Sequence, residues 1–152
     1  MISVKIEPFS VFKENKHLNN EHWNEVAEFD GFKRELDIDF DLFDMFDKAG
    51  QLITVIAREN EKVVGYALFI IQHDFHAKNT LCAHNDLIFL KKENRKGRAG
   101  IKLIKESLKL LSQIYPNIFV RWHVTALKDF GNVLTKLGCK KFETIYAIRA
   151  GV

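Results

Sequence analysis

The sequence predicts a single domain of the α+β class, in which a mixed, mostly antiparallel, twisted sheet of six to seven strands is flanked by about four helices. Three observations indicate this class. Several short segments alternate apolar and polar residues or are rich in β-branched residues, as strands are, and others repeat apolar residues at helical spacing. Glycines and turn residues separate these segments at short intervals. The 152 residues, 47% of them hydrophobic, suffice for one core, and no linker or repeat marks a boundary within residues 1–152.

The N-terminal third predicts a strand followed by two helices. Residues 2–7 alternate apolar and polar side chains, as a half-buried strand does. Residues 20–29 follow two asparagines, which can cap a helix, and carry an apolar stripe on one face. Residues 39–49 place three phenylalanines along a shorter helix, and Gly50 is typical of the position where a helix ends.

Three antiparallel strands are predicted next. Residues 52–58 and 62–72 are rich in β-branched and aromatic residues, and the short polar turn 59–61 joins them into a hairpin. A second hairpin connection at 74–79 leads into a strand over residues 80–90.

The C-terminal half alternates helices and strands. Residues 101–114 carry an apolar stripe at helical spacing, and Pro116 ends that region. A strand over 118–124, a helix over 129–137 and a last strand over 140–149 complete the predicted order.

Composition limits the classes of function. No run of 18 apolar residues and no signal-peptide pattern is present, so we expect a soluble protein of the cytoplasm. Cys82 and Cys139 have neither a metal spacing nor a disulfide framework, and we interpret both as reduced core residues. The oligomeric state is not fixed by the sequence, and a homodimer stays open.

The net charge of +3 divides unevenly along the chain. Residues 1–60 carry a net charge of −6 and residues 61–152 carry +9. A basic half suits a polyanionic ligand, either a nucleotide cofactor or nucleic acid. The positive residues concentrate in one loop and on the outer face of the helix that follows it, where Lys102, Lys105 and Lys109 are typical of a solvated face. This distribution favours a nucleotide over nucleic acid.

The loop at residues 91–100 is the most informative segment. It follows the predicted strand 80–90, contains five Lys or Arg residues and two glycines, and leads into a helix. The first N–H groups of a helix have no intrahelical acceptors, and the helix dipole adds partial positive charge there. The segment therefore predicts a site for a phosphate-bearing ligand.

This loop resembles the acetyl-CoA loop of the GCN5-related N-acetyltransferases (GNAT superfamily), whose pattern is Arg or Gln, two residues, Gly, one residue, and Gly or Ala. Arg95 fills the first position and Gly100 the last, whereas Arg98 stands where the first glycine is expected. The predicted order of strands and helices is similar to the family's over nearly the whole chain. Shorter stretches also resemble acetyltransferase-like proteins encoded by phages and prophages: His22-Trp23, Gly50-Gln51-Leu52, Ala57-Arg58, Val64-Gly65-Tyr66, His73 with His76, Asp86, and Leu137-Gly138.

The resemblance implies an N-acetyltransferase that uses acetyl-CoA, and no metal, to acetylate a primary amine, such as a protein lysine or N-terminus. A catalytically degenerate member that binds CoA or a protein partner is the alternative. Pantetheine is expected beside the end of strand 80–90, and the pyrophosphate on the amides of the loop. The residues implied in cofactor binding are Phe89, Leu90, Arg95, Lys96, Gly97, Arg98, Ala99 and Gly100.

Amine acetylation needs a general base within reach of the amine. Family members often use a carboxylate on the strand that enters the cofactor loop, and Asp86 holds such a place. Strict alternation places His84, Asp86, Ile88 and Leu90 on one face, so His84 is the expected partner of Asp86. A purely structural ion pair of Asp86 stays open, as does His123 as the base.

The family's usual general acid is a tyrosine four residues before the glycine that ends the late helix. Leu134 occupies that place, which leaves Tyr146 or water as the acid.

Four other residues are candidates for the acceptor pocket. His22 and Trp23 lie on the helix that walls this pocket in the family, although Trp23 also suits a core position. His73 and His76 flank the turn before strand 80–90 and could line the pocket or only stabilise the turn. Because a metal site needs further ligands, no metal is expected.

Overall fold

The computed structural model describes residues 1–30, 34–126 and 129–151. Its single sheet has five strands in the spatial order β1-β2-β3-β4-β5, and the β4–β5 pair is the parallel one. The strands are β1 (Ser3–Ile6), β2 (Leu52–Glu59), β3 (Lys62–His73), β4 (Leu81–Leu90) and β5 (Phe119–Trp122). The helices are α1 (Phe9–Glu14), α2 (Lys16–Asp30), α3 (Phe40–Lys48), α4 (Ala99–Ile114) and α5 (Gly131–Lys136), with a 3-10 turn η1 (Lys92–Asn94).

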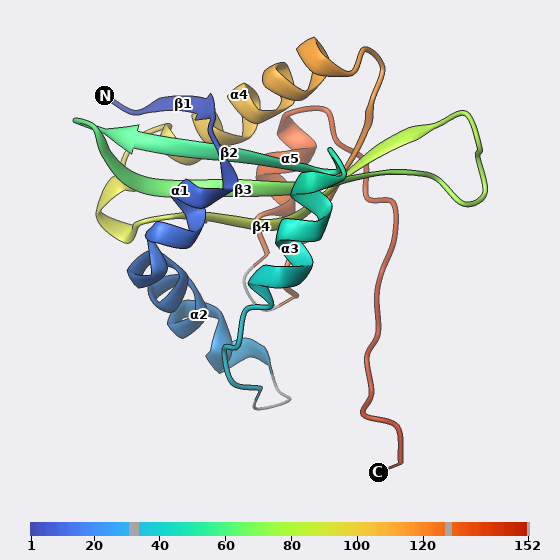
Figure 1. Cartoon of the computed structure of the whole chain (residues 1–152), viewed down its shortest axis with the longest axis horizontal. Coiled ribbons are helices and arrows are strands. Elements are labelled where there is room, and N and C mark those ends of the chain that lie inside the picture. The colour runs from blue at the N-terminus through green and yellow to red at the C-terminus, as the bar shows by residue number, and fades with distance from the viewer. Residues whose placement is uncertain (31–33, 127–128, 152) are drawn as a thin grey trace.

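The sheet separates two apolar cores (Figure 1). On one face, Phe9 and Phe12 of α1 and Leu18 of α2 pack against β2 and β3 together with α3. On the other face, Leu103 and Leu111 of α4 pack against the sheet. These layers confirm the predicted α+β class, and they leave β5 at the edge of the sheet.

The predicted antiparallel strands in the middle of the chain are confirmed. The β2–β3 turn has two residues, Asn60 and Glu61, with φ angles of 47° and 66°. Two successive positive φ angles match the right-handed twist of a hairpin. Nearby, the Arg58 guanidinium donates two hydrogen bonds of 2.7 Å to the Glu7 carboxylate and ties the segment after β1 to β2.

The helical region before β2 differs from the prediction. Helix α1 was not predicted, and α2 begins at Lys16, so the asparagines expected to cap it lie within the helix. Asn19 is buried, at 4% exposure. The physical reason is that Phe9, Phe12 and Leu18 form an apolar surface that a helical chain can pack under the sheet, and this tertiary contact outweighs the local capping signal.

The last predicted strand is wrong. Residues 140–149 form no strand, so the sheet has five strands instead of six or seven, and the described residues include five α-helices where about four were expected. All residues from 141 to 150 are exposed. The segment has the composition of a strand, but a strand also needs hydrogen-bonding partners for its N–H and C=O groups, and no described strand pairs with it.

A one-residue bulge in β4 corrects the predicted side-chain alternation. Leu68 of β3 pairs with Leu87, and Phe69 pairs with Asn85, so Asp86 is an extra residue with no partner in the ladder. Beyond a bulge the two faces exchange. His84 therefore shares its face with Leu87 and Phe89, and the prediction that it shares a face with Ile88 and Leu90 is wrong.

Candidate active site

Strands β4 and β5 separate at the bulge. Their parallel pairing runs from Cys82↔Phe119 to Asn85↔Trp122 and ends one residue before Asp86. Beyond this point β4 continues to Leu90 with β3 on one side and no described strand on the other. The fold thus opens a gap beside the second half of β4.

Peptide groups of β4 face this gap. The N–H of Lys91 donates to the Val64 carbonyl at 2.9 Å, and in an antiparallel ladder such bonded positions recur every second residue. The peptide groups of Ile88 and Leu90 therefore point away from β3. The Leu90 carbonyl accepts a hydrogen bond of 2.6 Å from Arg95 Nε, whereas the Leu90 N–H has no acceptor among the described residues. A ligand with amide groups could add to this edge as an extended strand does.

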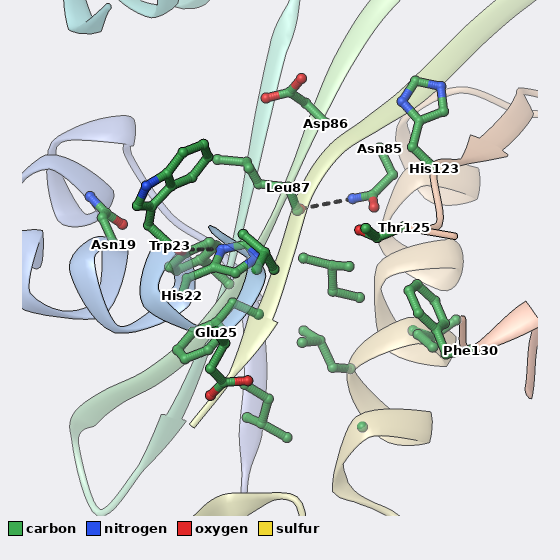
Figure 2. A pocket seen from close by; sticks show the side chains of 18 of the residues that line it. Asn19, His22, Trp23, Glu25, Asn85, Asp86, Leu87, His123, Thr125 and Phe130 are labelled. Atoms are coloured by element: carbon green, nitrogen blue, oxygen red, sulfur yellow. Dashed lines mark hydrogen bonds between the residues drawn. The ribbon is translucent and has the colours of Figure 1, made fainter. Parts of the chain in front are cut away.

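Asn85 fixes the shape of the bulge. Its side chain is 1% exposed, and its Nδ2 donates to the carbonyl of Leu68 at 3.2 Å and to that of Leu87 at 2.9 Å (Figure 2). These bonds tie one buried side chain to a carbonyl of β3 and to a carbonyl of β4 next to the bulge. Asn85 was not predicted from the sequence, although a polar residue inside the apolar run of β4 is a signal that could have indicated it.

A cavity of about 1080 Å³ surrounds this part of β4. Figure 2 shows side chains of α2, among them His22 and Trp23, on one side of β4, and His123, Thr125 and Phe130 on the other. Asp86 lines the same cavity, as do Gly97 and Gly100 of the basic loop. The structure therefore brings the predicted base and the predicted phosphate loop to one space.

Asp86 has an unusual electrostatic environment. Solvent reaches its side chain, yet the cavity walls remove much of its hydration, and this desolvation raises the pKa of the carboxyl above its ordinary value of 3.8. The charge of His123 opposes the shift and lowers the pKa. A carboxylate with a raised pKa holds a proton more strongly, which makes it a better general base.

His84 lies close to His123. Its ring centroid is 6.1 Å from that of His123, and its Nε2 is 3.1 Å from Nε2 of Gln72. Desolvation lowers the pKa of His84, and the nearby charges of Arg121 and His123 lower it further. His84 is therefore neutral near pH 7. The expected hydrogen bond between His84 and Asp86 is not among the contacts of the described residues.

The amides of the basic loop are available for a ligand. No N–H group from Lys96 to Ile101 has an acceptor among the described residues, and the side chain of Arg98, the N-cap residue of α4, does not cap the helix. Gly97 adopts φ +67°, a conformation that side-chain-bearing residues rarely adopt. Arg98 is exposed. Consecutive uncapped amides at a helix start, with two glycines on the cavity wall, fit a pyrophosphate group.

Arg95 anchors the loop to α2. Its Nε donates to the Leu90 carbonyl, its terminal nitrogen lies 2.8 Å from the Glu25 carboxylate, and its guanidinium stacks 5.4 Å from the centre of the Phe89 ring. Asn94 donates a further hydrogen bond of 2.7 Å to Glu59. In this arrangement Arg95 holds the loop in place, and a phosphate contact would compete with Glu25.

Aromatic residues wall the cavity beside α2. His22 Nδ1 is 2.9 Å from the Tyr66 hydroxyl, and the His22 ring stacks on Phe89 with centroids 4.8 Å apart. Burial raises the pKa of Tyr66 well above its usual range, so its hydroxyl stays protonated. Trp23 is partly buried and lines the cavity. His22 and Trp23 thus line the cavity, and their contact with an acceptor stays a prediction.

Other candidates lie away from the cavity. His73 and His76 are exposed on the β3–β4 turn, where the Asp74 carboxylate accepts hydrogen bonds from the backbone N–H groups of His76 and Ala77. Tyr146 is 91% exposed in the C-terminal segment. Leu134 is buried, at 6% exposure.

The described residues contain neither a candidate metal cluster nor a membrane-spanning helix. Among the described residues, no group of three or more His, Cys, Asp or Glu side chains could hold a metal ion. Within the same part of the chain, no helix combines the length and apolarity needed to cross a membrane.

Comparisons with known proteins support the fold. No family model matches the sequence, and no curated protein matches it. Among solved structures, an aminoglycoside acetyltransferase from an uncultured soil metagenomic sample is 16% identical, with a TM-score of 0.71 and 99% of each chain covered. A predicted acetyltransferase from Clostridium acetobutylicum, solved with acetyl-CoA, is 15% identical, with a TM-score of 0.67 over 98% of this chain and 96% of that one.

A transcriptional regulator from Bacillus halodurans is 13% identical, with a TM-score of 0.73 over 98% of this chain and 99% of the other. Identities this low carry the fold alone. The chain has the fold of the acetyltransferases that it matches, which is consistent with the predicted GNAT fold, although the sheet has five described strands instead of six to seven.

Proposed function

We propose that this chain is an acetyl-CoA-dependent N-acetyltransferase that acetylates a primary amine, such as a lysine side chain or the N-terminus of a protein. One observation carries the proposal: the uncapped amides at the start of α4 and the desolvated carboxylate of Asp86 meet in one cavity, at the point where β4 and β5 separate. An anion site and a general base in one cavity are what acyl transfer from a phosphorylated thioester donor requires.

The cavity residues fit the donor in three places. The amides from Lys96 to Ile101 would hold its pyrophosphate. The outward peptide groups of Ile88 and Leu90 would bond the amides of its pantetheine arm, while Phe89, whose ring is buried between Tyr66 and His22, would shape the wall. Bound there, the donor supplies a thioester whose C–S bond breaks as the amine nitrogen bonds to the carbonyl carbon.

Asp86 is the proposed base. An amine of ordinary pKa near 10.4 is almost wholly protonated at pH 7, and removing its proton costs about 4.6 kcal/mol. A positioned base contributes about 10²- to 10⁴-fold in rate. Asp86 would accept the proton directly or through water, and the neighbouring His123 would stabilise the ionised carboxylate when charged and could itself serve as base.

The leaving thiolate of CoA does not need a strong general acid. A free thiol has a pKa near 8.5, so a thiolate leaves readily near neutral pH. Because Leu134 is buried and Tyr146 lies in an exposed segment, we assign the final proton to water instead of a tyrosine. Tyr66 does reach the cavity, but its raised pKa makes it a weak acid.

Binding is tested by thermal unfolding in the presence of acetyl-CoA. A ligand at one hundred times its dissociation constant stabilises the native state by about 2.7 kcal/mol. At about 2–4 °C per kcal/mol for a chain of this size, the melting temperature should rise by about 5–11 °C. No shift at millimolar acetyl-CoA would exclude the proposal.

Catalysis is tested with Asp86→Asn, which keeps the size of the side chain and removes the base. This variant should bind acetyl-CoA as the wild type does and should transfer the acetyl group to lysine peptides or small amines at least tenfold more slowly. Asp47→Asn, which changes an exposed acid on α3 outside the cavity, is the matched control. Equal turnover by Asp86→Asn and wild type would exclude Asp86 as the base.

A second candidate is a CoA-binding or protein-binding module without turnover. The buried Leu134 at the position of the family's usual acid favours it. The transferase and a CoA-binding module both predict a thermal shift with acetyl-CoA, and only the transferase predicts release of free CoA thiol when an amine is added. A module that binds only a protein predicts neither result.

A further inference from the structure

The C-terminal arm, residues 140–150, is an extended segment that pairs with no strand of the described chain. Its apolar side chains are exposed, at 77% for Ile145, 91% for Tyr146 and 84% for Ile148. Figure 1 shows the arm leaving the body of the molecule and running away from it to the C-terminus. No backbone hydrogen bond joins residues 140–148 to the other described residues.

The arm has the composition of a strand and not of a linker. Phe142, Ile145, Tyr146 and Ile148 are aromatic or β-branched residues, which favour strands. Burying one such side chain is worth about 1.5–3 kcal/mol relative to leaving it in water. A disordered tail typically lacks such residues. The sequence therefore favours a strand here, and no described segment of the chain pairs with it.

A matching unpaired edge is present on the same molecule. β5 is the last strand of the sheet, and it pairs with β4 on one side only. On its other side, no described strand lies next to it, and Phe119 is 39% exposed. An open edge of this kind is a template for an added strand.

The arm starts beside β5 of its own chain and then leaves it. The Phe142 ring packs edge-on against Phe119, with centroids 5.5 Å apart, and lies 5.2 Å from the Arg121 guanidinium. From residue 141 to residue 149 the backbone contains no turn that could bring the chain back. The arm's direction therefore favours the edge of another molecule over its own.

We propose that the arm of one chain adds to the free edge of β5 in a second copy, and that the exchange is reciprocal. Each molecule carries one arm and one free β5 edge, so a twofold dimer pairs both arms with both β5 edges at once, while β1 stays the other edge of each sheet. Each sheet then gains a sixth strand. This interface gives a definite form to the homodimer that the sequence left open, and it does not depend on the proposed activity.

The apolar content of two arms suffices for a stable interface. Aromatic side chains bury about 150–250 Å² each, so Tyr146 from two arms contributes about 300–500 Å², and the part of each Phe142 ring that its own chain leaves exposed adds to this. Ile145 and Ile148 of both chains and the paired backbone add to this. The total reaches the range of about 1,200–2,000 Å² that specific interfaces bury.

Sedimentation velocity of the full chain tests the proposal. The wild type should sediment as a dimer of twice the 17.7 kDa chain mass at micromolar concentration. Ile145→Pro removes an N–H donor from the middle of the arm, and Ile148→Lys places a charge in the interface; both should yield monomers. Phe75→Asp, at an equally exposed aromatic residue on the β3–β4 turn, is the control and should stay dimeric.

Hydrogen exchange locates the interface. In the wild type, the amides of residues 142–148 and of β5 should be protected together, and Ile145→Pro should remove both protections while the amides of β2 and β3 stay protected, because the core remains folded. A wild-type monomer overturns the proposal, whether its arm is protected by folding back or unprotected. A dimer that persists in Ile145→Pro with an unprotected arm also overturns it and assigns the interface to another surface, such as the exposed Leu42 and Met45 of α3.

Discussion

Replacing Gly100 by alanine should stabilise the free protein and weaken its binding of acetyl-CoA. Gly100 lies in the first turn of α4, lines the cavity, and would place an added Cβ atom in open space, with no other atom within 4 Å. Its φ is not in the left-handed region, so alanine fits the backbone. Gly to Ala in a helix is worth about 0.5–1 kcal/mol, which corresponds to a melting temperature higher by about 1–4 °C.

The same methyl group would occupy space that the pyrophosphate needs. We expect at least a tenfold weaker dissociation constant, equivalent to about 1.4 kcal/mol. At a concentration of one hundred times the wild-type dissociation constant, the stabilisation by acetyl-CoA should fall from about 2.7 to about 1.4 kcal/mol. Thermal unfolding with and without acetyl-CoA therefore measures two effects of opposite sign on one variant.

Gly50→Ala is the matched control. Gly50 follows α3 and has a φ of +69°, so a side chain there is strained and should cost about 1–2 kcal/mol of stability. Because Gly50 is outside the cavity, the shift produced by acetyl-CoA should match that of the wild type. The reasoning about the loop is refuted if Gly100→Ala binds acetyl-CoA as tightly as the wild type does, since the open space at Gly100 would then not be the ligand site.

Three further predictions concern charges. The rate of acetyl transfer should fall as the pH is lowered through the raised pKa of Asp86. Because the raised pKa means that ionised Asp86 destabilises the folded state, Asp86→Asn should raise the melting temperature at pH 7 and leave it unchanged below pH 3.8. The control Asp47→Asn should not raise the melting temperature at pH 7. The hydrogen bond from Arg58 lowers the pKa of Glu7, so this pair stabilises the fold above pH 4.5 and loses that effect as the pH falls through the lowered pKa. Glu7→Gln should lower the free energy of unfolding, measured with urea, by about 0.5–1 kcal/mol at pH 7 and should leave it unchanged near pH 2. Arg95→Lys keeps the charge but loses the guanidinium group that bonds both the Leu90 carbonyl and the Glu25 carboxylate and so holds the loop. Isothermal titration should show weaker acetyl-CoA binding by this variant than by the control Lys96→Arg, which changes an exposed side chain.

The sequence was most informative where local and tertiary signals agree. The hairpin strands β2, β3 and β4 have alternating or continuous apolar residues and clear turns, and they were predicted within two residues of their observed bounds. The helix start after the basic loop was also predicted to within two residues, because a strand, glycines and an amphipathic stripe all indicate it.

Prediction failed where the outcome depends on a neighbour. Residues 140–149 have strand propensity but pair with no strand among the described residues, and propensity alone does not reveal that. Asn19 and Asn20 resemble a helix cap, but packing of Leu18 under the sheet extends the helix past them. Arg95 matches the motif, yet only the fold shows that Glu25 already holds it.

The bulge at Asp86 links the fold to the proposed chemistry through a single residue. One extra residue in β4 ends the pairing with β5, turns the peptide groups of Ile88 and Leu90 toward the gap, and moves a carboxylate to the rim of the cavity. A regular strand cannot do all three, since its side chains alternate strictly and its neighbour would stay paired. The buried Asn85 stabilises the irregularity through the carbonyls on both sides of it. The site therefore depends less on the identity of the loop cations than on this irregular strand, which is why a motif lacking its usual glycine at position 98 is compatible with the proposed function.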